Sequence, residues 1–235
     1  MSSEEKAQRH VLSLDVGGTY TRAILFNGEG KALRRREVYT AMLKPEEGAM
    51  EHDPEELWNA VRRVVEDLIE DLPRRGKEIE ALGLSVQRAT FCLWDRRSGE
   101  VRSPFISWSD VRSGAQTRRM NRFWVWKTIQ FFAALGSFIT RSTFLTAASH
   151  LTFVTDHVLP RILWLFRRDP GLYREAKEGR LLFGTIDTFL VYRLTGGRVH
   201  ATDTSNAAAT SLYNPFSLKW NKLFCRIFGV PMGRL

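Results

Sequence analysis

The stretch VLSLDVGGTYTRAILF, residues 11–26, decides the fold of this chain. The apolar run Val11–Val16 and a second β-like run, Arg22–Phe26, lie on either side of a pair of glycines. Short apolar runs separated by glycines are typical of two strands joined by a tight turn. In a dinucleotide-binding unit a helix would follow the glycines, whereas here a second strand pattern follows. The stretch therefore predicts a β-hairpin.

The sequence after the hairpin predicts a third strand and then a helix. Turn residues at 27–30 lead into Ala32–Tyr39, which extends the hairpin to a three-stranded antiparallel meander. The helix has a clear start, because Asp53 is a good N-cap residue and Pro54 suits the first helical position. Its apolar residues repeat at helical spacing, and we expect it to end at Pro73.

The remaining patterns predict an α/β domain in which helices pack against the sheet that the three antiparallel strands open. The sequence contains no internal repeat and no low-complexity linker, so residues 10–235 are expected to form one domain after a polar tail of residues 1–9. The further predicted elements are strands at Ala81–Val86 and Thr90–Trp94, a turn at Asp95–Gly99, and helices at Val158–Phe166, Leu172–Lys177 and Gly184–Leu194.

Composition and charge limit the class of protein. The 235 residues carry a formal net charge of +9, which can indicate a nucleic-acid or anionic membrane partner. The arginines are scattered as pairs and form no long basic tract with interleaved aromatics, so we expect no nucleic-acid partner. Residues 1–10 do not resemble a signal peptide. Cys92 and Cys225 have no metal-ligand spacing and cannot form a disulfide framework, which favours a cytoplasmic location.

One apolar segment raises the question of a membrane. Residues 123–139 read FWVWKTIQFFAALGSFI, but the uncharged run is shorter than the roughly 20 residues that a spanning helix needs. We expect a helix that is buried or that packs on a partner or a further domain. Contact with a membrane interface is the alternative that the composition of this segment leaves open.

The glycine turn is the first candidate site. Two glycines bring backbone amides close to phosphate oxygens, and Arg22 can pair with phosphate through its fork of donors. Asp15, at the end of a buried strand, can hold a magnesium ion through water. A plain hairpin turn is the competing interpretation. The candidate nucleotide-binding residues are Gly18, Thr19, Tyr20, Thr21 and Arg22.

Two further motifs carry polar residues between apolar runs. Gln87 and Arg88 follow a predicted strand, where they can hydrogen-bond vicinal hydroxyls, although a surface salt bridge would also explain Arg88. The third motif joins Phe183–Leu190 to Ala201–Ala208. Its local explanation is helix capping by Thr185 and a polar turn around residues 203–206.

Taken in order, these motifs resemble the FGGY carbohydrate kinases, and within them the glycerol kinases. The shared pattern is DxGGTxxR from Asp15, SxQR from Ser85, and GTIDTFLxxxLTxGxxxxTDxSNA from Gly184. HDPEELW at residues 52–58 and ISWSDVR at residues 106–112 also match. The resemblance runs from about residue 11 to residue 230, with a weak middle at 121–159. SVQRATF and the aromatic insertion in that middle look most like the divergent animal branch called glycerol kinase 5.

The resemblance implies two ribonuclease-H-like, actin-like domains with ATP-Mg and substrate in the cleft between them. The amino-terminal domain would be built on a mixed sheet that opens with the three-stranded meander and has helices on both faces. By position, the glycine-turn residues would lie at the phosphate loop, with Asp15 near magnesium. Gln87 and Arg88 would face the polyol. The implied reaction is ATP-dependent phosphorylation of a small polyol or sugar, with ATP and Mg²⁺ as cofactors.

The chain departs from the family pattern at three places. Ala89 stands where glycerol kinases have a Glu that contacts a hydroxyl. Phe144 and Phe153 occupy the region of a Tyr that contacts glycerol. The family's general base is an Asp in a GDQQ-like motif, which these 235 residues do not contain. The base is therefore expected beyond residue 235, in a carboxy-terminal domain, and the chain by itself is expected to be inactive.

A second function from a different class competes with the kinase. The chain could instead be a non-catalytic binding or regulatory module that uses the phosphate loop or the aromatic segment 123–139. Association with a second copy of the chain is also left open. A downstream sequence with a GDQQ-type Asp would favour the enzyme.

Overall fold

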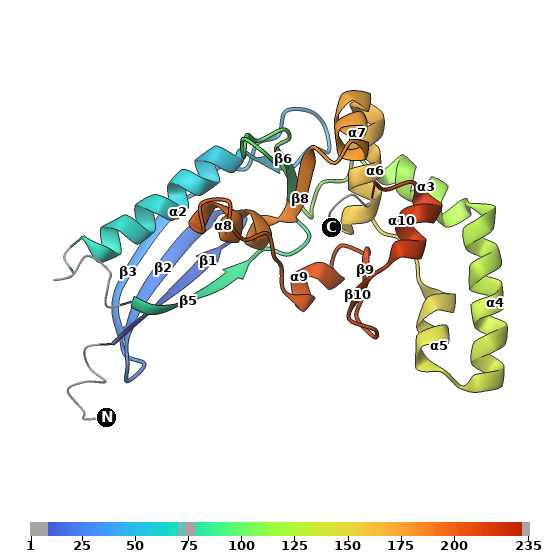
Figure 1. Ribbon diagram of the computed structural model, residues 1–235, viewed down its shortest axis with the longest axis horizontal. Helices are drawn as coiled ribbons and strands as arrows, with labels where there is room; N and C mark the ends of the chain where they lie inside the picture. The colour runs from blue at the N-terminus through green and yellow to red at the C-terminus, as the bar shows by residue number, and fades with distance from the viewer. Residues whose placement is uncertain (1–8, 71, 73–78, 232–235) are drawn as a thin grey trace.

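The computed structural model describes residues 9–70, 72 and 79–231. The chain forms an arch, with a twisted sheet and helix α2 at one end and the helices α4 and α5 at the other (Figure 1). Helix α2 ends at Ile69. The predicted stop at Pro73 lies outside the described residues.

The first sheet is mixed and confirms the predicted meander. Its order is β3-β2-β1-β5, in which β1 pairs antiparallel with β2 and parallel with β5. The strands are β1 (His10–Val16), β2 (Tyr20–Asn27), β3 (Ala32–Tyr39) and β5 (Ile79–Val86). In β1 the inward residues Leu12, Leu14 and Val16 are buried and form a core with α2, as the period of two in a strand requires.

Helix α2 (Pro54–Ile69) packs against β2 and β3 on the buried face of this sheet. It begins as predicted, because the Asp53 side chain accepts hydrogen bonds from the amides of Glu55 and Glu56. Helix α8 (Ile186–Leu194) joins the same core through Ile186 and Phe189. Both helices therefore fix the position of β1 from one side.

The second sheet is antiparallel and has helices on both faces. Its order is β4-β7-β6-β8, formed by Glu51–His52, Phe105–Ile106, Phe91–Asp95 and Leu181–Thr185. Phe91 and Leu93 face a cluster with α6 (Val158–Arg168) and α7 (Pro170–Lys177). Cys92 and Trp94 face the opposite cluster, which contains α8. The two sheets and their helices therefore confirm the predicted α/β class, and the second sheet has helices on both of its faces.

The predicted helix at Gly184–Leu194 begins later than expected. Residues 181–185 are strand β8, which pairs with β6, and α8 starts at Ile186. A Cβ at Gly184 would stand 2.5 Å from the Trp94 ring and 2.7 Å from the Thr188 side chain. Glycine is needed there because the strand, the ring and the helix meet at this point.

A helical hairpin forms the other end of the arch. Helix α3 (Gly114–Arg122) leads into α4 (Trp124–Thr140) and α5 (Thr143–His150), which pack against each other. The predicted helix over residues 123–139 is present, but it is not buried: Trp126 and Ala133 are its buried residues. None of the helices in the described part of the chain is long and apolar enough to cross a membrane. The last elements in the described part of the chain are α9 (Thr204–Ala208), β9 (Tyr213–Asn214), β10 (Lys219–Trp220) and α10 (Lys222–Phe228).

Candidate functional site

The glycine turn lies next to the residues that follow β5. The Gly17 amide donates to the Tyr20 carbonyl (3.0 Å), and the Gln87 amide donates to the Val16 carbonyl (3.1 Å). A Cβ at Gly18 would lie 3.4 Å from Gln87 Oε1. The parallel pairing of β1 with β5 therefore brings the first two predicted motifs side by side.

A buried histidine orients Gln87, and the sequence analysis did not assign it a role. His52 is fully buried, and its Nδ1 lies 3.0 Å from the Ala41 carbonyl. Since a carbonyl can only accept, Nδ1 carries the proton and Nε2 accepts from Gln87 Nε2 at 3.1 Å. Gln87 Oε1 is then left next to Gly18, buried and without a partner in the described residues. The site thus holds one preset acceptor beside the glycine turn.

Acid should weaken the fold through this histidine. Burial lowers the pKa of His52 and of His157 from the ordinary value near 6.5. The unfolded chain therefore binds more protons as the pH falls, and stability is lost below about pH 6.5 while it is complete at higher pH. Urea midpoints should fall between pH 7.5 and 5.5. In the His52→Asn variant the midpoint should fall less over this pH range. In the control His150→Asn, which changes an exposed histidine, it should fall as much as in the wild type. A wild-type midpoint that does not depend on pH would contradict a role of the buried histidines in acid sensitivity.

Arg88 joins the second motif to the third. Its Nη1 donates to Ser205 Oγ (3.3 Å) on α9. The polar turn predicted around residues 203–206 is instead the start of this short helix, with Asp203 as N-cap accepting from the amides of Ser205 (2.6 Å) and Asn206 (2.9 Å). Burial would raise the pKa of Asp203, but hydrogen bonds from Asn206 and Ser205 and the charge of Arg88 lower it. A stable carboxylate therefore fixes α9 beside Arg88.

Arg161 is a second residue to which the sequence analysis assigned no role. Its hydrogen bonds connect segments that surround the site. It is fully buried in α6 and donates to backbone carbonyls instead of to carboxylates. Burial lowers the pKa of Arg161 to about 10. Its bonds reach the carbonyls of Ala89 (2.6 Å), Ile106 (2.9 Å), Ser107 (2.6 Å), Asp156 (2.7 Å) and His157 (3.2 Å). A lone arginine within the apolar run VLPRILWLF was the available signal.

Ala89, one of the residues whose carbonyl Arg161 contacts, has an unusual backbone conformation. Its φ is +61°, a left-handed conformation that a residue with a Cβ seldom adopts. The Ala89 side chain is buried against Phe91 and Ile106, and its carbonyl accepts from Arg161. The turn that presents Arg88 is therefore held in one conformation by the groups beneath it.

The side chains of the glycine turn divide between the two faces of the sheet. Asp15, Arg22 and Glu37 stand opposite one another on neighbouring strands, with Arg22 Nε 3.1 Å from Glu37 and Arg22 Nη1 3.6 Å from Asp15. Thr19 is exposed at the turn itself. Thr21 is fully buried on the other face, and its hydroxyl is 3.1 Å from that of Thr40. Thr21 is one of the predicted nucleotide-binding residues, but its buried hydroxyl lies against Thr40 and supports the turn from inside.

The donor set at Asp15 fits a magnesium ion that is held mainly by phosphate. Mg²⁺ commonly takes one or two carboxylates and completes its shell with water and substrate phosphates. Asp15 offers one partly exposed carboxylate beside the glycine turn. Within the described residues there is no group of three or more His, Cys, Asp or Glu that could hold a metal by themselves.

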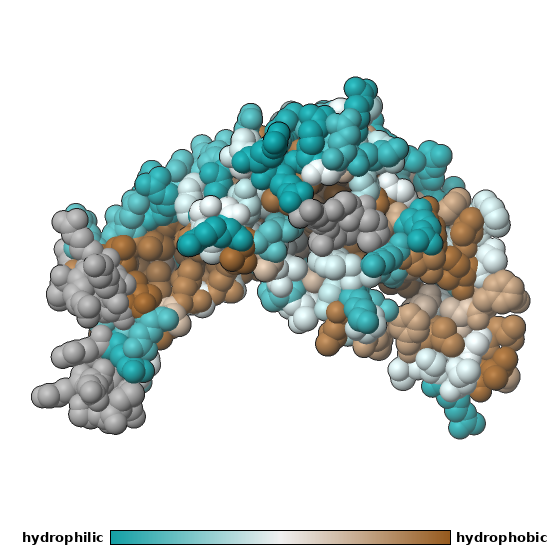
Figure 2. Space-filling view, viewed as in Figure 1, coloured by the Kyte–Doolittle hydropathy of each residue, from teal (hydrophilic) through white to brown (hydrophobic). Residues whose placement is uncertain are grey.

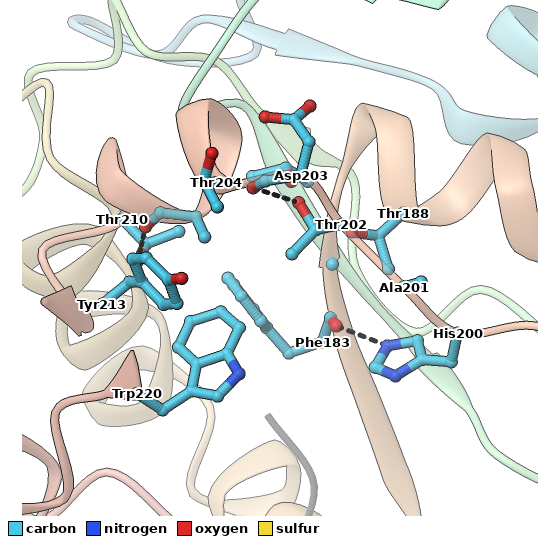
Figure 3. Close-up of a pocket in the computed structure, with 13 residues that line it drawn as sticks. Phe183, Thr188, His200, Ala201, Thr202, Asp203, Thr204, Thr210, Tyr213 and Trp220 are labelled. Carbon is cyan, nitrogen blue, oxygen red and sulfur yellow. Dashed lines mark hydrogen bonds between the residues drawn. The ribbon is translucent and has the colours of Figure 1, made fainter. Parts of the chain in front are cut away.

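A pocket of about 230 Å³ is lined mainly by residues of the third motif (Figure 3). Phe183, Thr202 and Trp220 line it, and His200 closes one edge with a 2.9 Å hydrogen bond to the Phe183 carbonyl. Thr185 also lines it and stands at the N-cap position of α8 as predicted, but its side chain makes no capping hydrogen bond. Its hydroxyl donates to the buried Asp187 (2.5 Å), which also accepts from Thr202 (2.6 Å). This pocket contains neither the glycine turn nor Gln87 and Arg88.

Comparison with known proteins places the chain in a family. The model of the N-terminal domain of the FGGY family of carbohydrate kinases matches residues 10–235. Glycerol kinase 5 from Danio rerio is 35% identical over 230 residues, which are 98% of this chain and 44% of that protein. Glycerol kinase from Coxiella burnetii (strain RSA 493 / Nine Mile phase I) is 34% identical over 225 residues, 96% of this chain and 42% of that protein. The chain therefore spans less than half the length of these relatives.

Solved structures share the fold. Glycerol kinase from Plasmodium falciparum, crystallised with ADP, superposes with a TM-score of 0.80 at 24% identity over 95% of this chain and 41% of its own. Xylulose kinase from Rhodospirillum rubrum gives a TM-score of 0.74 at 21% identity over 97% and 42%. These likenesses confirm for this chain the actin-like fold that the resemblance implied. The chain belongs to the FGGY family of carbohydrate kinases, and its residues 10–235 correspond to the N-terminal domain of that family.

Proposed function

We propose that this chain supplies the phosphate loop and the polyol contacts of an ATP-dependent kinase that acts on a small polyol or sugar. The observation that carries the proposal is the meeting of the glycine turn, Gln87 and Arg88 at one place. The described residues leave Gln87 Oε1 without a partner there, and Arg88 is exposed. An acceptor and a fork of donors side by side are suited to vicinal hydroxyl groups.

Each residue of the proposed site would have a role that its chemistry allows. The amides and hydroxyls at Gly18 and Thr19 would bind phosphate oxygens, and Arg22 would exchange its exposed pairing with Glu37 for the charge of the transferring phosphoryl group. Asp15 would hold Mg²⁺ through water; the bound ion neutralises phosphate charge. Gln87 and Arg88 would orient the attacking hydroxyl. The base that takes its proton would come from the carboxy-terminal half of a longer kinase, as in the family pattern.

An ATP-consumption assay tests the proposal. Residues 1–235 alone should release no substrate-dependent ADP with glycerol or a panel of sugars, because loss of a general base costs about 10²- to 10⁴-fold. A chimera that joins this chain to the part of the Danio rerio relative beyond the match should restore turnover. Turnover by the chain alone at the rate of that relative would overturn the half-site assignment.

Arg88→Ala tests the polyol contact within the chimera. We expect the KM for the accepted polyol to rise about tenfold, since a hydrogen bond from a charged donor contributes about 1.5 kcal/mol or more. The KM for ATP should change little. Arg97→Ala is the matched control, because Arg97 is also exposed but lies in the turn after β6. An unchanged KM for the polyol in Arg88→Ala would remove Arg88 from the site.

A further inference from the structure

The hairpin of α4 and α5, residues 124–150, exposes an apolar surface that the proposed kinase function does not use. Apolar side chains gather over these two helices at the end of the arch (Figure 2). Phe138 is 86% exposed, Trp124 72% and Ile139 71%. The other large apolar residues exposed on α4 are Phe131, Phe132 and Leu135.

These side chains form one continuous stripe along α4. At 100° per residue, Trp124, Phe131, Leu135 and Phe138 fall on one side of the helix, and the buried Trp126 falls on the opposite side. Thr128 is the polar residue within the stripe. Helix α4 is therefore apolar toward the protein core and apolar toward the outside, a distribution found in helices buried in protein or lipid.

Five hydroxyl groups of the hairpin donate to backbone carbonyls of the hairpin itself. Thr128 donates to the Trp124 carbonyl at 3.0 Å, so the stripe presents no free donor at its centre. The same internal bonding holds for Ser137 to Ala134, Thr140 to Gly136, Thr146 to Ser142 and Ser149 to Thr146. Internal satisfaction of polar groups is required in hydrocarbon, where no water replaces a missing partner.

The charge around the hairpin has a single sign. Residues 113–155 contain five Arg or Lys and no Asp or Glu. Arg118, Arg119 and Arg122 line a shallow surface depression together with Phe123 and Trp124, at the start of the stripe. Arginines next to an exposed tryptophan match the headgroup region of an anionic membrane, where both residue types are favoured.

We propose that the α4–α5 hairpin docks this chain on an anionic lipid surface, with the α4 stripe lying in the interface plane. A helix of 17 residues is about 25 Å long, shorter than the roughly 30 Å hydrocarbon core. The described helices include none that could cross a membrane. Lipid is favoured over a second copy of the chain because two such surfaces would bring the five basic residues of each against the other.

Vesicle flotation with the whole chain tests the proposal. Vesicles of phosphatidylcholine with about one third phosphatidylserine should bind the chain, and phosphatidylcholine alone should bind it weakly. The Phe131→Gln/Phe138→Gln variant should lose about a hundredfold in partitioning, because both rings leave the lipid. Arg118→Gln/Arg122→Gln should lose about thirtyfold, and added salt should reproduce part of that loss.

The matched control is Leu33→Gln/Val199→Gln, which removes two exposed apolar residues from the other end of the arch and from the loop after α8. It should bind as the wild type does, and circular dichroism should show all variants folded. Three outcomes would overturn the proposal: no flotation on anionic vesicles, flotation that the phenylalanine changes leave intact, or equal flotation on neutral vesicles. Loss of self-association in the phenylalanine variant without any vesicle binding would assign the surface to a second copy.

Discussion

Replacing Arg161 with methionine should lower the free energy of unfolding by about 3 kcal/mol or more. The methionine fills most of the space of the arginine stem but donates no hydrogen bond. Five carbonyls lose a charged donor at once, among them those of Ala89 and Ser107, and an unsatisfied buried acceptor costs about 1–3 kcal/mol. Arg161→Lys should fall in between, because it keeps the charge but cannot reach all five acceptors with three donors.

Urea unfolding followed by circular dichroism measures this loss. Arg63→Met on α2 is the control, because Arg63 is exposed and its replacement should change the midpoint little. A loss below about 1 kcal/mol in Arg161→Met would mean that water or neighbouring groups satisfy the carbonyls, and Arg161 would not be the residue that holds the site together.

The elements that the sequence predicted well carry local signals. The glycine pair, the turn at residues 27–30 and the cap at Asp53 each act within a few residues, and the structure confirms all three elements. Strand β8 was missed because Leu181–Thr185 is a short apolar run that reads equally well as the start of a helix. Its partner, β6, lies some ninety residues earlier in the chain, so no local pattern reveals the pairing.

In the candidate site, too, the residues with a local sequence signal were predicted and those with distant partners were not. The motif residues Gly18, Gln87 and Arg88 were singled out by type and position, and the structure brings them together. The inward position of Thr21 could have been predicted, since it alternates in phase with the buried Ala23 and Leu25. The role of Arg161 could not have been predicted in this way. Its partners are backbone carbonyls from three separate segments, and any residue type supplies a carbonyl.

Replacing Arg22 with alanine should lower the turnover of the assembled chimera about 10²- to 10³-fold. Charge-assisted contacts to a transferring phosphoryl group act mainly in the transition state, so the loss should appear in kcat. Stability should hardly change, because the pairs of Arg22 with Glu37 and Asp15 are partly exposed and such pairs contribute little. Kinetics with ATP and the accepted polyol, together with the urea midpoint of each variant, separate the two effects.

Arg35→Ala is the sharpest control for this prediction. Arg35 donates to the same Glu37 oxygen at 2.8 Å and belongs to the same face of the sheet, but its strand position lies two residues further from the turn. If Arg22 acts on phosphate, Arg35→Ala should keep turnover near that of the unmodified chimera. Equal losses in both variants would mean that the charge of this sheet face matters rather than a contact with phosphate. Full turnover in Arg22→Ala would leave the amides of the glycine turn and Mg²⁺ to stabilise the phosphoryl group without an arginine.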